Sequence, residues 1–389
     1  MINAISNNIQ FLVGDKALCN LAYKINSFGC NRPMLICDDM TYRLGQKKIL
    51  LHSFDATGLN IAVVDQLIGN IATVADVERI LNLFVKNNCD CIITLGRRGA
   101  ISAGKAVKIM LKDGVNKLDY YSSHKLGAYE VLDAPLFVVP INLAGAGEGL
   151  KSARVYQDDS KVFQFETDSA ESNVIVIDEV MTDTLPPKAV ASYGLYAFAC
   201  ACEACAHCDD NIYFRPYAVT AINILRENLM PSILHNANVK FRTNLMSAVV
   251  FAEKAYSYLG STLLSELSHI ISDRYRANYC NVFSLLFARY ITMHKYSQEL
   301  LAELLLPLGG EKAYIECVEE ARANRTIECV EQVFAKVNET VDYQYGLSKF
   351  GVDKAHFTAI AEQAIGYLDP DDEEARYTFI MELLEKSFE

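Results

Sequence analysis

The chain has 389 residues and a formal net charge of −12, with 51% hydrophobic and 22% charged residues. Its length exceeds the size at which one hydrophobic core usually stops growing, so we expect two domains, and its composition excludes a disordered or fibrous protein. The sequence has no local cluster of Lys and Arg, so nucleic acid is excluded as an expected partner, because neutralising phosphates requires local positive charge.

Short β-rich runs alternate with helical stretches up to about Asp178. Strands are predicted within residues 31–39, 59–67, 89–99, 134–142 and 171–179, and an amphipathic helix within 72–88. Apolar strands separated by helices specify βαβ units and therefore a mostly parallel sheet covered on both faces. We predict an α/β domain over residues 1–183.

The pattern changes after the turn-like residues 183–189. Helical periodicity dominates to the end of the chain, as in residues 216–229, 296–308 and 371–388. We predict an all-helical domain over residues 184–389, so the fold class is α/β plus all-α.

Neither a targeting signal nor a membrane span is expected. The first residues, MINAISNNIQ, lack a basic region followed by an apolar one, and the longest apolar stretch, Tyr193 to Ala206, is too short and too rich in Ala and Cys to cross a bilayer. We expect a cytoplasmic protein. Its twelve cysteines are then reduced thiols, most of them small buried hydrophobic residues.

The architecture and its motifs resemble the iron-containing (group III) alcohol dehydrogenases, which belong to the dehydroquinate synthase-like superfamily. The resemblance covers nearly the whole chain and is clearest at CDCIITLGRRGAISAGKAVKIM, FVVPINLAGAGEG and SELSHIISDRYRANY. It implies a Rossmann-like nucleotide domain, a helical metal domain, a dinucleotide bound between them, and hydride transfer to a carbonyl beside a metal ion.

In this family, three glycines and a serine bind the pyrophosphate at a helix N-terminus. The corresponding residues here are Gly96, Arg97, Arg98 and Gly99. Two arginines in place of glycines hold the backbone farther from an anion, although their side chains can fork onto phosphate oxygens. The alternative is a solvated turn with two exposed arginines. Lys105 keeps the family pattern, whereas Ser102 replaces an acidic residue.

A second glycine-rich loop lines the nicotinamide side in the family. Here Asn142, Gly145 and Gly147 keep the glycine turn, but the hydroxyl side chains are absent. Asp38 or Asp39 stands where an acidic residue in such folds binds the adenosine ribose and disfavours a 2′-phosphate. The resemblance therefore implies NAD as the cofactor.

The family's metal ligands are all replaced. Its Asp and His four residues apart, and its two histidines fourteen apart, correspond here to Tyr196, Cys200, Ser265 and Tyr279. Without a carboxylate or an imidazole at these positions, the nitrogen and oxygen ligands that suit Fe or Zn are missing, and we expect no metal. His269 remains at the unligating, proton-relay position of the family.

The stretch CACEACAHC, from Cys200 to Cys208, raises the possibility of a replacement metal site. It contains no Gly or Pro and favours a continuous helix, on which Tyr196, Cys200, Glu203 and His207 share one face while Cys202, Cys205 and Cys208 lie around the other side. Four thiolates cannot converge from such a helix. Cys200 and His207 with a donor from another helix form one alternative, and cysteines packed in a buried helix form the other.

Two roles are open for His269 and the tyrosines. His269, helped by Arg274 or Arg276, is a candidate proton donor, and Tyr196 or Tyr279 is a candidate for orienting a substrate oxygen. Alternatively, the histidine packs or caps a helix and the tyrosines fill the volume of the missing ion.

Three functions follow. The first is an NAD(H)-dependent oxidoreductase, of the alcohol dehydrogenase or aldehyde or ketone reductase type, acting on a small carbonyl or alcohol without a metal ion. The second is a non-catalytic relative that serves as a binding or assembly module. The third is an enzyme that binds a phosphorylated substrate through Arg97 and Arg98. The resemblance also implies a homodimer or larger homo-oligomer.

Overall fold

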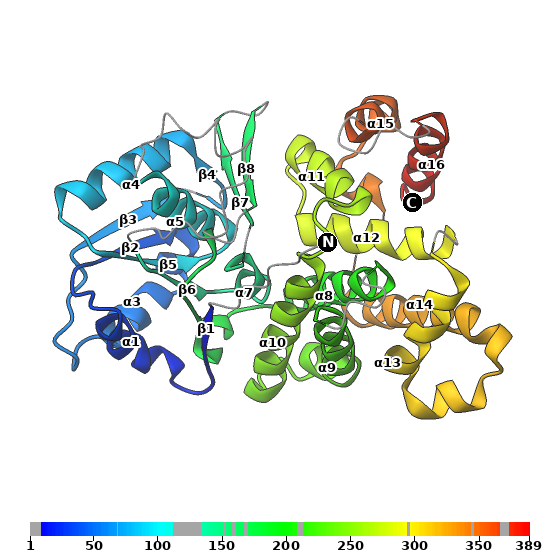
Figure 1. Cartoon of the computed structure of the whole chain (residues 1–389), viewed down its shortest axis with the longest axis horizontal. Coiled ribbons are helices and arrows are strands. Elements are labelled where there is room, and N and C mark those ends of the chain that lie inside the picture. The colour runs from blue at the N-terminus through cyan, green and yellow to red at the C-terminus, as the bar shows by residue number, and fades with distance from the viewer. Residues whose placement is uncertain are drawn as a thin grey trace. The chain divides into compact units, whose positions relative to one another are not determined.

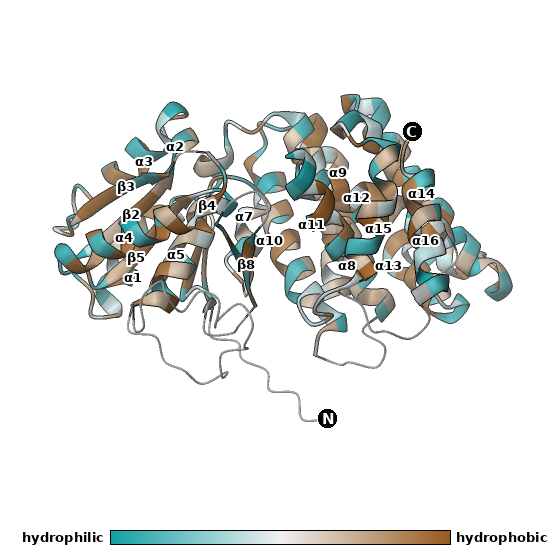
Figure 2. Cartoon of the chain, turned by 90° about the horizontal axis from the view of Figure 1, so that it is seen from above, coloured by the Kyte–Doolittle hydropathy of each residue, from teal (hydrophilic) through white to brown (hydrophobic). Residues whose placement is uncertain are grey.

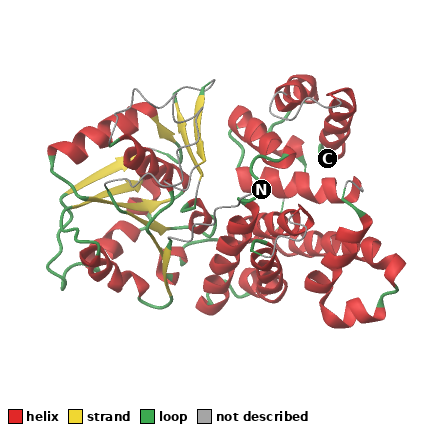
Figure 3. Cartoon of the chain, viewed as in Figure 1, coloured by secondary structure: helices red, strands yellow, loops and turns green. Residues whose placement is uncertain are grey.

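The computed structural model describes residues 9–67, 69–111, 134–150, 152–157, 161–166, 170–207, 213–293, 296–343, 346–365 and 373–389. The chain divides into two compact units, Met1–Leu185 and Pro186–Glu389. This division lies close to the domain boundary expected at residue 183. Figure 1 draws the first unit from blue to green and the second from green to red. Strands occur in the first unit, whereas the described residues of the second form helices and loops (Figure 3).

The first unit contains a parallel sheet, as the alternation of strands and helices predicted. Its strand order is β1-β9-β6-β5-β2-β3. The bounds are β1 Gln10–Val13, β2 Pro33–Asp38, β3 Val63–Leu67, β5 Cys91–Gly96, β6 Leu136–Pro140 and β9 Val174–Ile177. Every neighbouring pair in this sheet is parallel, so all carboxyl ends meet at one edge.

Helices cover both faces of this sheet, which explains its continuous apolar strands. Alternate residues of β5 point to opposite faces. Ile93 and Leu95 join the core formed with α1 (Leu21–Ser27) and α3 (Gln46–His52), while Ile92 and Thr94 face α5 (Arg98–Met110). In Figure 1, α1 and α3 lie on one side of the sheet and α4 (Val74–Lys86) and α5 on the other.

The predicted amphipathic helix within residues 72–88 is α4. Thr73 caps its N-terminus in a capping box with Asp76, which satisfies main-chain N–H groups that would otherwise lack partners. Val77, Ile80 and Phe84 form the buried face. Hydrophilic and hydrophobic residues alternate along its ribbon in Figure 2. The shorter helices of this unit are η1 (Ala17–Asn20), α2 (Asp39–Arg43), α7 (Gly145–Glu148) and η4 (Glu179–Thr182).

The sequence did not predict a second, three-stranded sheet. It has the order β4-β7-β8, with β4 Ala72–Thr73, β7 Ser152–Tyr156 and β8 Val162–Glu166. The antiparallel pair β7–β8 is short and mixes polar with apolar residues, so its signal is weak. This sheet packs on α5.

Helix α8 (Pro187–His207) is the central helix of the second unit. It packs against α9 (Arg215–Leu234), α10 (Val239–Tyr256) and α12 (Tyr279–Tyr290). The other helices are α11 Leu263–Tyr275, η5 Ile291–Met293, α13 Gln298–Glu316, η6 Glu319–Ala321, α14 Arg322–Val341, η7 Leu347–Phe350, η8 Lys354–His356, α15 Phe357–Ile365 and α16 Glu373–Lys386.

The length and burial of α8 correct one expectation and confirm another. The helix is long and apolar enough to cross a bilayer, contrary to the sequence estimate, but 89% of its apolar window is buried inside the protein, as in a core helix. Cys200, Cys202 and Cys205 are each at most 3% exposed, so they pack as small hydrophobic residues, as expected. Cys208 lies outside the described residues.

The close packing of α5 on β5 generates a stability prediction. A Cβ atom at Gly104 would clash with Thr94 Cγ2 and lie 3.3 Å from Leu136 Cδ1. We expect Gly104→Ala to lower the free energy of unfolding by about 1–3 kcal/mol, because overpacking a buried contact strains its neighbours. Denaturant unfolding measures this change. Thr94→Ala in the same chain removes the opposing methyl group and should restore most of the loss; a double variant as unstable as Gly104→Ala would contradict the assignment.

Candidate active site

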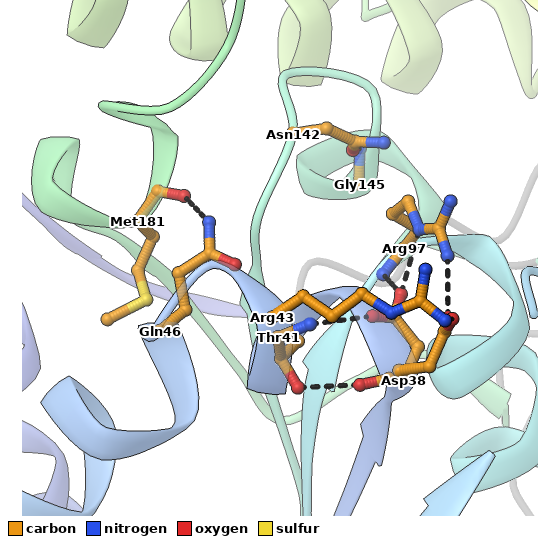
Figure 4. A network of polar contacts seen from close by, with 9 residues as sticks. Asp38, Thr41, Arg43, Gln46, Arg97, Asn142, Gly145 and Met181 are labelled. Carbon is orange, nitrogen blue, oxygen red and sulfur yellow. Dashed lines mark hydrogen bonds and ion pairs between the residues drawn. The ribbon is translucent and has the colours of Figure 1, made fainter. Parts of the chain in front are cut away.

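Asp38 ends β2 at the carboxyl edge of the parallel sheet, and its carboxylate is fully buried. Asp38 Oδ1 accepts a hydrogen bond from the Thr41 main-chain N–H at 3.2 Å and so caps α2. Asp38 Oδ2 accepts from Arg97 N at 3.0 Å and Arg97 Nε at 2.9 Å. Figure 4 shows Asp38 between Thr41 and Arg97. The buried charge is therefore stabilised by hydrogen bonds.

Both arginines of the predicted anion-binding loop form ion pairs with acidic residues. Besides Asp38, Arg97 contacts Asp39, with 3.4 Å between Arg97 Nη2 and Asp39 Oδ1. Arg98 Nε lies 2.8 Å from Glu148 Oε1. The Arg97 and Arg98 side chains are each 24% exposed. In this conformation the charge of both guanidinium groups is balanced by acidic residues of the first unit, and the loop is not a fully solvated turn.

The start of α5 is closely packed. Arg97 is its N-cap residue and donates its main-chain N–H to the Asp38 carboxylate, so a carboxylate of the protein occupies part of the anion position at this helix N-terminus. Gly96 has φ +155°, and a Cβ there would lie 3.0 Å from Asp38 Oδ2. A Cβ at Gly99 would lie 2.7 Å from the Asn70 carbonyl carbon. Both glycines are needed for these approaches.

Lys105, predicted to contact the cofactor, is fully buried within the first unit. Its Nζ donates to the main-chain carbonyls of Glu148 at 2.5 Å, of Ser152 at 2.8 Å, and of Leu150. Three carbonyl acceptors match the three N–H donors of an ammonium group. Lys105 therefore holds the chain that leaves the glycine-rich loop.

An asparagine side chain of the glycine-rich loop accepts a hydrogen bond from the main chain of the same loop. Asn142 Oδ1 accepts from the Gly145 main-chain N–H at 2.6 Å, and a Cβ at Gly145 would lie 2.8 Å from the same oxygen (Figure 4). Gly147 is buried in α7 and its carbonyl accepts from Leu150 N at 2.8 Å. In the same region, Gln46 Nε2 donates to the Met181 carbonyl at 2.7 Å. The expected loop is thus built as a tight turn at the carboxyl edge of the sheet.

In the helical unit, aromatic side chains occupy two of the four positions that the resemblance aligns with metal ligands. Tyr196 of α8 packs edge-on against Tyr279, with ring centroids 5.8 Å apart, and against Phe283 at 5.5 Å. Tyr279 also lies 4.4 Å from the His269 ring, in a stacked arrangement. Tyr256 packs on Phe283 at 5.4 Å. We call Tyr196, Tyr256, His269, Tyr279 and Phe283 the aromatic cluster.

The donor set at these positions does not fit the family's divalent ion. Burial raises the pKa of Tyr196 and of Cys200 well above their usual values, and the Glu253 carboxylate raises the pKa of Cys200 further. Both groups are therefore neutral in the metal-free protein, and none of the four side chains at these positions is the carboxylate or imidazole that suits the family's divalent ion. The Ser265 hydroxyl belongs to the capping box of α11, where it accepts from Thr262 N and donates to Thr262 O.

His269 is half-buried on α11 and stacks on Tyr279, so the structure brings together two of the predicted catalytic residues. Tyr196 reaches the pair through its edge-on contact with Tyr279. Of the two predicted helpers, Arg274 donates to Gln363 at 3.4 Å and Arg276 ends α11 in the left-handed conformation. A neutral phenol beside an imidazole can donate a hydrogen bond while the imidazole transfers a proton.

Two acids, the buried Glu203 and the half-buried Glu253, were not predicted as site residues. Glu203 accepts a hydrogen bond from the Tyr296 hydroxyl, and its Oε1 lies 3.6 Å from His207 Nε2; burial raises the pKa of Glu203 to about 7. Helical periodicity placed Glu203 and His207 on one face, but no sequence signal pointed to Tyr296. Glu253 of α10 acts electrostatically on Tyr196 and Cys200, and only the packing of α10 on α8 brings it there.

Comparison with known proteins matches both units. Residues 8–179 match the family described as "Iron-containing alcohol dehydrogenase", and residues 190–388 match "Fe-containing alcohol dehydrogenase family, C-terminal". "Alcohol dehydrogenase 4" of Saccharomyces cerevisiae (strain YJM789) is 22% identical over 90% of this chain and 89% of its own.

Solved structures show the same fold. "Alcohol dehydrogenase from Oenococcus oeni" has a TM-score of 0.84 at 19% identity, covering 97% of this chain and 98% of its own. A sulfoacetaldehyde reductase from Bifidobacterium kashiwanohense, solved in complex with NAD+, has a TM-score of 0.76 at 14% identity and covers 99% of each chain.

The position of Lys105 generates a prediction about the loop. We expect Lys105→Met to lower the free energy of unfolding by about 3 kcal/mol or more, because it leaves buried carbonyls without donors. Amide hydrogen exchange should accelerate across residues 142–150. Lys108→Met is the matched control, since Lys108 lies in the same helix but donates to Glu171 O at 2.9 Å. If amide hydrogen exchange accelerates equally in both variants, Lys105 does not stabilise this loop specifically.

The buried Glu203 carboxyl generates a prediction about pH. Because its folded pKa of about 7 exceeds its ordinary value of 4.5, the folded state binds more protons between these values, and its stability falls as the pH rises through this window. We expect a loss of up to about 3 kcal/mol that Glu203→Gln removes. Urea unfolding at several pH values measures it. Glu299→Gln changes an exposed residue and is the control, so its stability should depend on pH as the parent's does. If the stability of Glu203→Gln also depends on pH as the parent's does, the prediction is refuted.

Proposed function

The chain belongs to the iron-containing alcohol dehydrogenase family and is an oxidoreductase of that type, and from this premise we propose that it uses NAD(H) and acts without the family's metal ion. The observation that carries the metal-free part is the aromatic cluster. Tyrosine, cysteine and serine side chains stand at the four positions aligned with metal ligands; Tyr196, Cys200 and Ser265 are buried and Tyr279 is half-buried. The retained His269 stacks on Tyr279.

The choice of NAD rests on charge at the end of β2. Asp38 and Asp39 are adjacent there, and negative charge disfavours the 2′-phosphate of NADP. Because Asp38 is fully buried while the Asp39 side chain is 21% exposed, we assign the ribose contact to Asp39 instead of Asp38. The relative solved with NAD+ has the same fold and supports this cofactor.

The proposed reaction is reversible hydride transfer. His269 would deliver the proton to the carbonyl oxygen of an aldehyde or ketone, and bound NADH would supply the hydride for the carbonyl carbon, which gives the alcohol and NAD+. The hydroxyl of Tyr196, kept protonated by burial, or the hydroxyl of Tyr279 donates a hydrogen bond to the same oxygen. Hydrogen bonding thereby replaces the polarisation that a metal ion supplies in the family.

We expect small alcohols and aldehydes as substrates, a cytoplasmic location, and a homodimer or larger homo-oligomer. A phosphorylated substrate bound through Arg97 and Arg98 is disfavoured, because both guanidinium groups already form ion pairs with acidic residues. This substrate class would require those pairs to open.

One observation favours a second candidate, a non-catalytic binding module. The Asp38 carboxylate accepts the Arg97 main-chain N–H at the start of α5, where the family binds pyrophosphate. A nucleotide must bind beside this carboxylate or displace it. Nucleotide affinity therefore separates the two candidates.

The test is calorimetric titration of chelator-treated protein with NADH and NADPH, followed by aldehyde reduction. We expect the protein to bind NADH with micromolar affinity and NADPH at least about tenfold more weakly, and we expect turnover to survive chelation. His269→Ala should lower kcat by about a hundredfold to ten-thousandfold with NADH affinity retained, because only the proton transfer is lost.

His235→Ala is the matched control, since His235 is an exposed histidine at the end of α9. It should leave kcat unchanged. No NADH binding at millimolar concentration would remove the hydride carrier and favour the binding module. Turnover that disappears on chelation and returns with one equivalent of iron or zinc would refute metal-free catalysis.

A further inference from the structure

A second group of donor atoms lies at the amino edge of the parallel sheet, the edge opposite Asp38 and Arg97. Cys30 precedes β2, and Asp90 and Cys91 lie at the start of β5. The two thiol sulfurs and a carboxylate oxygen of Asp90 all lie within 4.8 Å of one another. Cys91 is fully buried, Cys30 is 6% exposed, and Asp90 is half-buried. We propose that Cys30, Asp90 and Cys91 bind a divalent cation of the zinc class.

The chain geometry holds these donors together without an ion. Strands β2 and β5 are paired with Pro33 opposite Cys91, and Asp90 N donates to the Arg32 carbonyl at 3.2 Å. The segment carrying Cys30 is folded back by a turn in which Gly29 has φ +78°, and Cys30 N donates to Ile25 O at 3.3 Å. Residues distant in sequence are thus fixed side by side by main-chain contacts.

The Asp90 carboxylate is oriented by main-chain donors. Its Oδ2 accepts from Asn31 N at 2.8 Å and from Arg32 N at 3.1 Å, and its Oδ1 accepts from Arg32 N at 3.0 Å. Oδ1 therefore has a second lone pair available for a ligand. Outer hydrogen bonds of this kind orient metal ligands in proteins. The Arg32 side chain donates to the carbonyls of Asn87 and Asn88, which holds the chain that leads into Asp90.

The donor atoms of this site favour one class of metal ion. Two sulfurs with one oxygen suit Zn²⁺ and Cd²⁺ and disfavour Mg²⁺ or Ca²⁺, which prefer oxygen alone. Tetrahedral Zn²⁺ with bonds of about 2.3 Å to sulfur places two sulfurs roughly 3.8 Å apart, so side-chain adjustments of about 1 Å complete the site. Because Asp90 is half-buried, water can supply the fourth ligand. The thiols lose their protons to the ion on binding.

This site lies within the first unit and uses none of the residues proposed for hydride transfer. Joining the turns before β2 and β5 would tie two sheet strands together, so its expected role is structural. Chelation that removes this ion is expected to lower the free energy of unfolding and to leave the aromatic cluster of the second unit unchanged. The proposal is therefore independent of the metal-free catalysis proposed above.

The test is titration of the reduced, metal-free protein with Cd²⁺, followed by the ultraviolet thiolate-to-cadmium absorption, and then competition with Zn²⁺. We expect one tightly bound ion per chain, a higher melting temperature with Zn²⁺, and loss of the absorption in Cys30→Ser and in Cys91→Ser. Asp90→Asn, which keeps an oxygen acceptor for Asn31 and Arg32, should weaken binding about tenfold or more.

Cys89→Ser is the matched control, because Cys89 adjoins Asp90 in the chain but is outside the donor group, and it should bind as the parent does. Melting of each variant without metal shows whether it folds. Absence of cadmium absorption in the parent would overturn the proposal. So would absorption that survives in both Cys30→Ser and Cys91→Ser, or that is lost equally in Cys89→Ser.

Discussion

A buried ammonium group holds together the parts of the first unit on which its candidate site depends. Burying a charge is costly unless hydrogen bonds replace its hydration, and Lys105 meets this requirement with three main-chain carbonyls between Glu148 and Ser152. These carbonyls belong to the chain that leads from the glycine-rich loop into β7. One side chain of α5 therefore sets the path of that loop and the position of the smaller sheet. The ion pair between Arg98 and Glu148 adds a contact at the same place.

Charge in the two units is arranged in contrasting ways. At the carboxyl edge of the parallel sheet, Asp38, Asp39 and Arg97 form a compact set of ion pairs that takes the anion position at the start of α5. In the helical unit, the aromatic cluster is built from uncharged side chains. Burial stabilises the neutral forms of Tyr196 and Cys200, so both side chains can donate hydrogen bonds. With neutral hydrogen-bond donors in this region, the proposed hydride transfer would depend on His269 for its proton.

The parallel sheet separates two kinds of chemistry. Its carboxyl edge carries the side chains proposed to bind the dinucleotide, and its amino edge carries Cys30, Asp90 and Cys91. A strand of six residues such as β5 spans about 20 Å, so an ion at the amino edge would act on stability and leave the nucleotide-binding edge to its own contacts. The proposed thiol site therefore lies apart from the residues that align with the family's metal ligands, which belong to the helical unit.

The sequence by itself determined the secondary structure that has strong periodicity. Buried strands such as Cys91–Gly96, the helix Val74–Lys86 and the cysteine-rich helix Pro187–His207 follow from local pattern, since burial on both faces of a sheet or around a helix leaves continuous apolar runs. The motifs also identified the family and the side chains at each loop. Only the tertiary structure decided which charges meet. Asp38 pairs with Arg97, Lys105 reaches the carbonyls beyond Gly147, Tyr296 meets Glu203, and Cys30 approaches Cys91, each between residues far apart in the chain. Such contacts depend on strand order and helix packing, which no local pattern encodes.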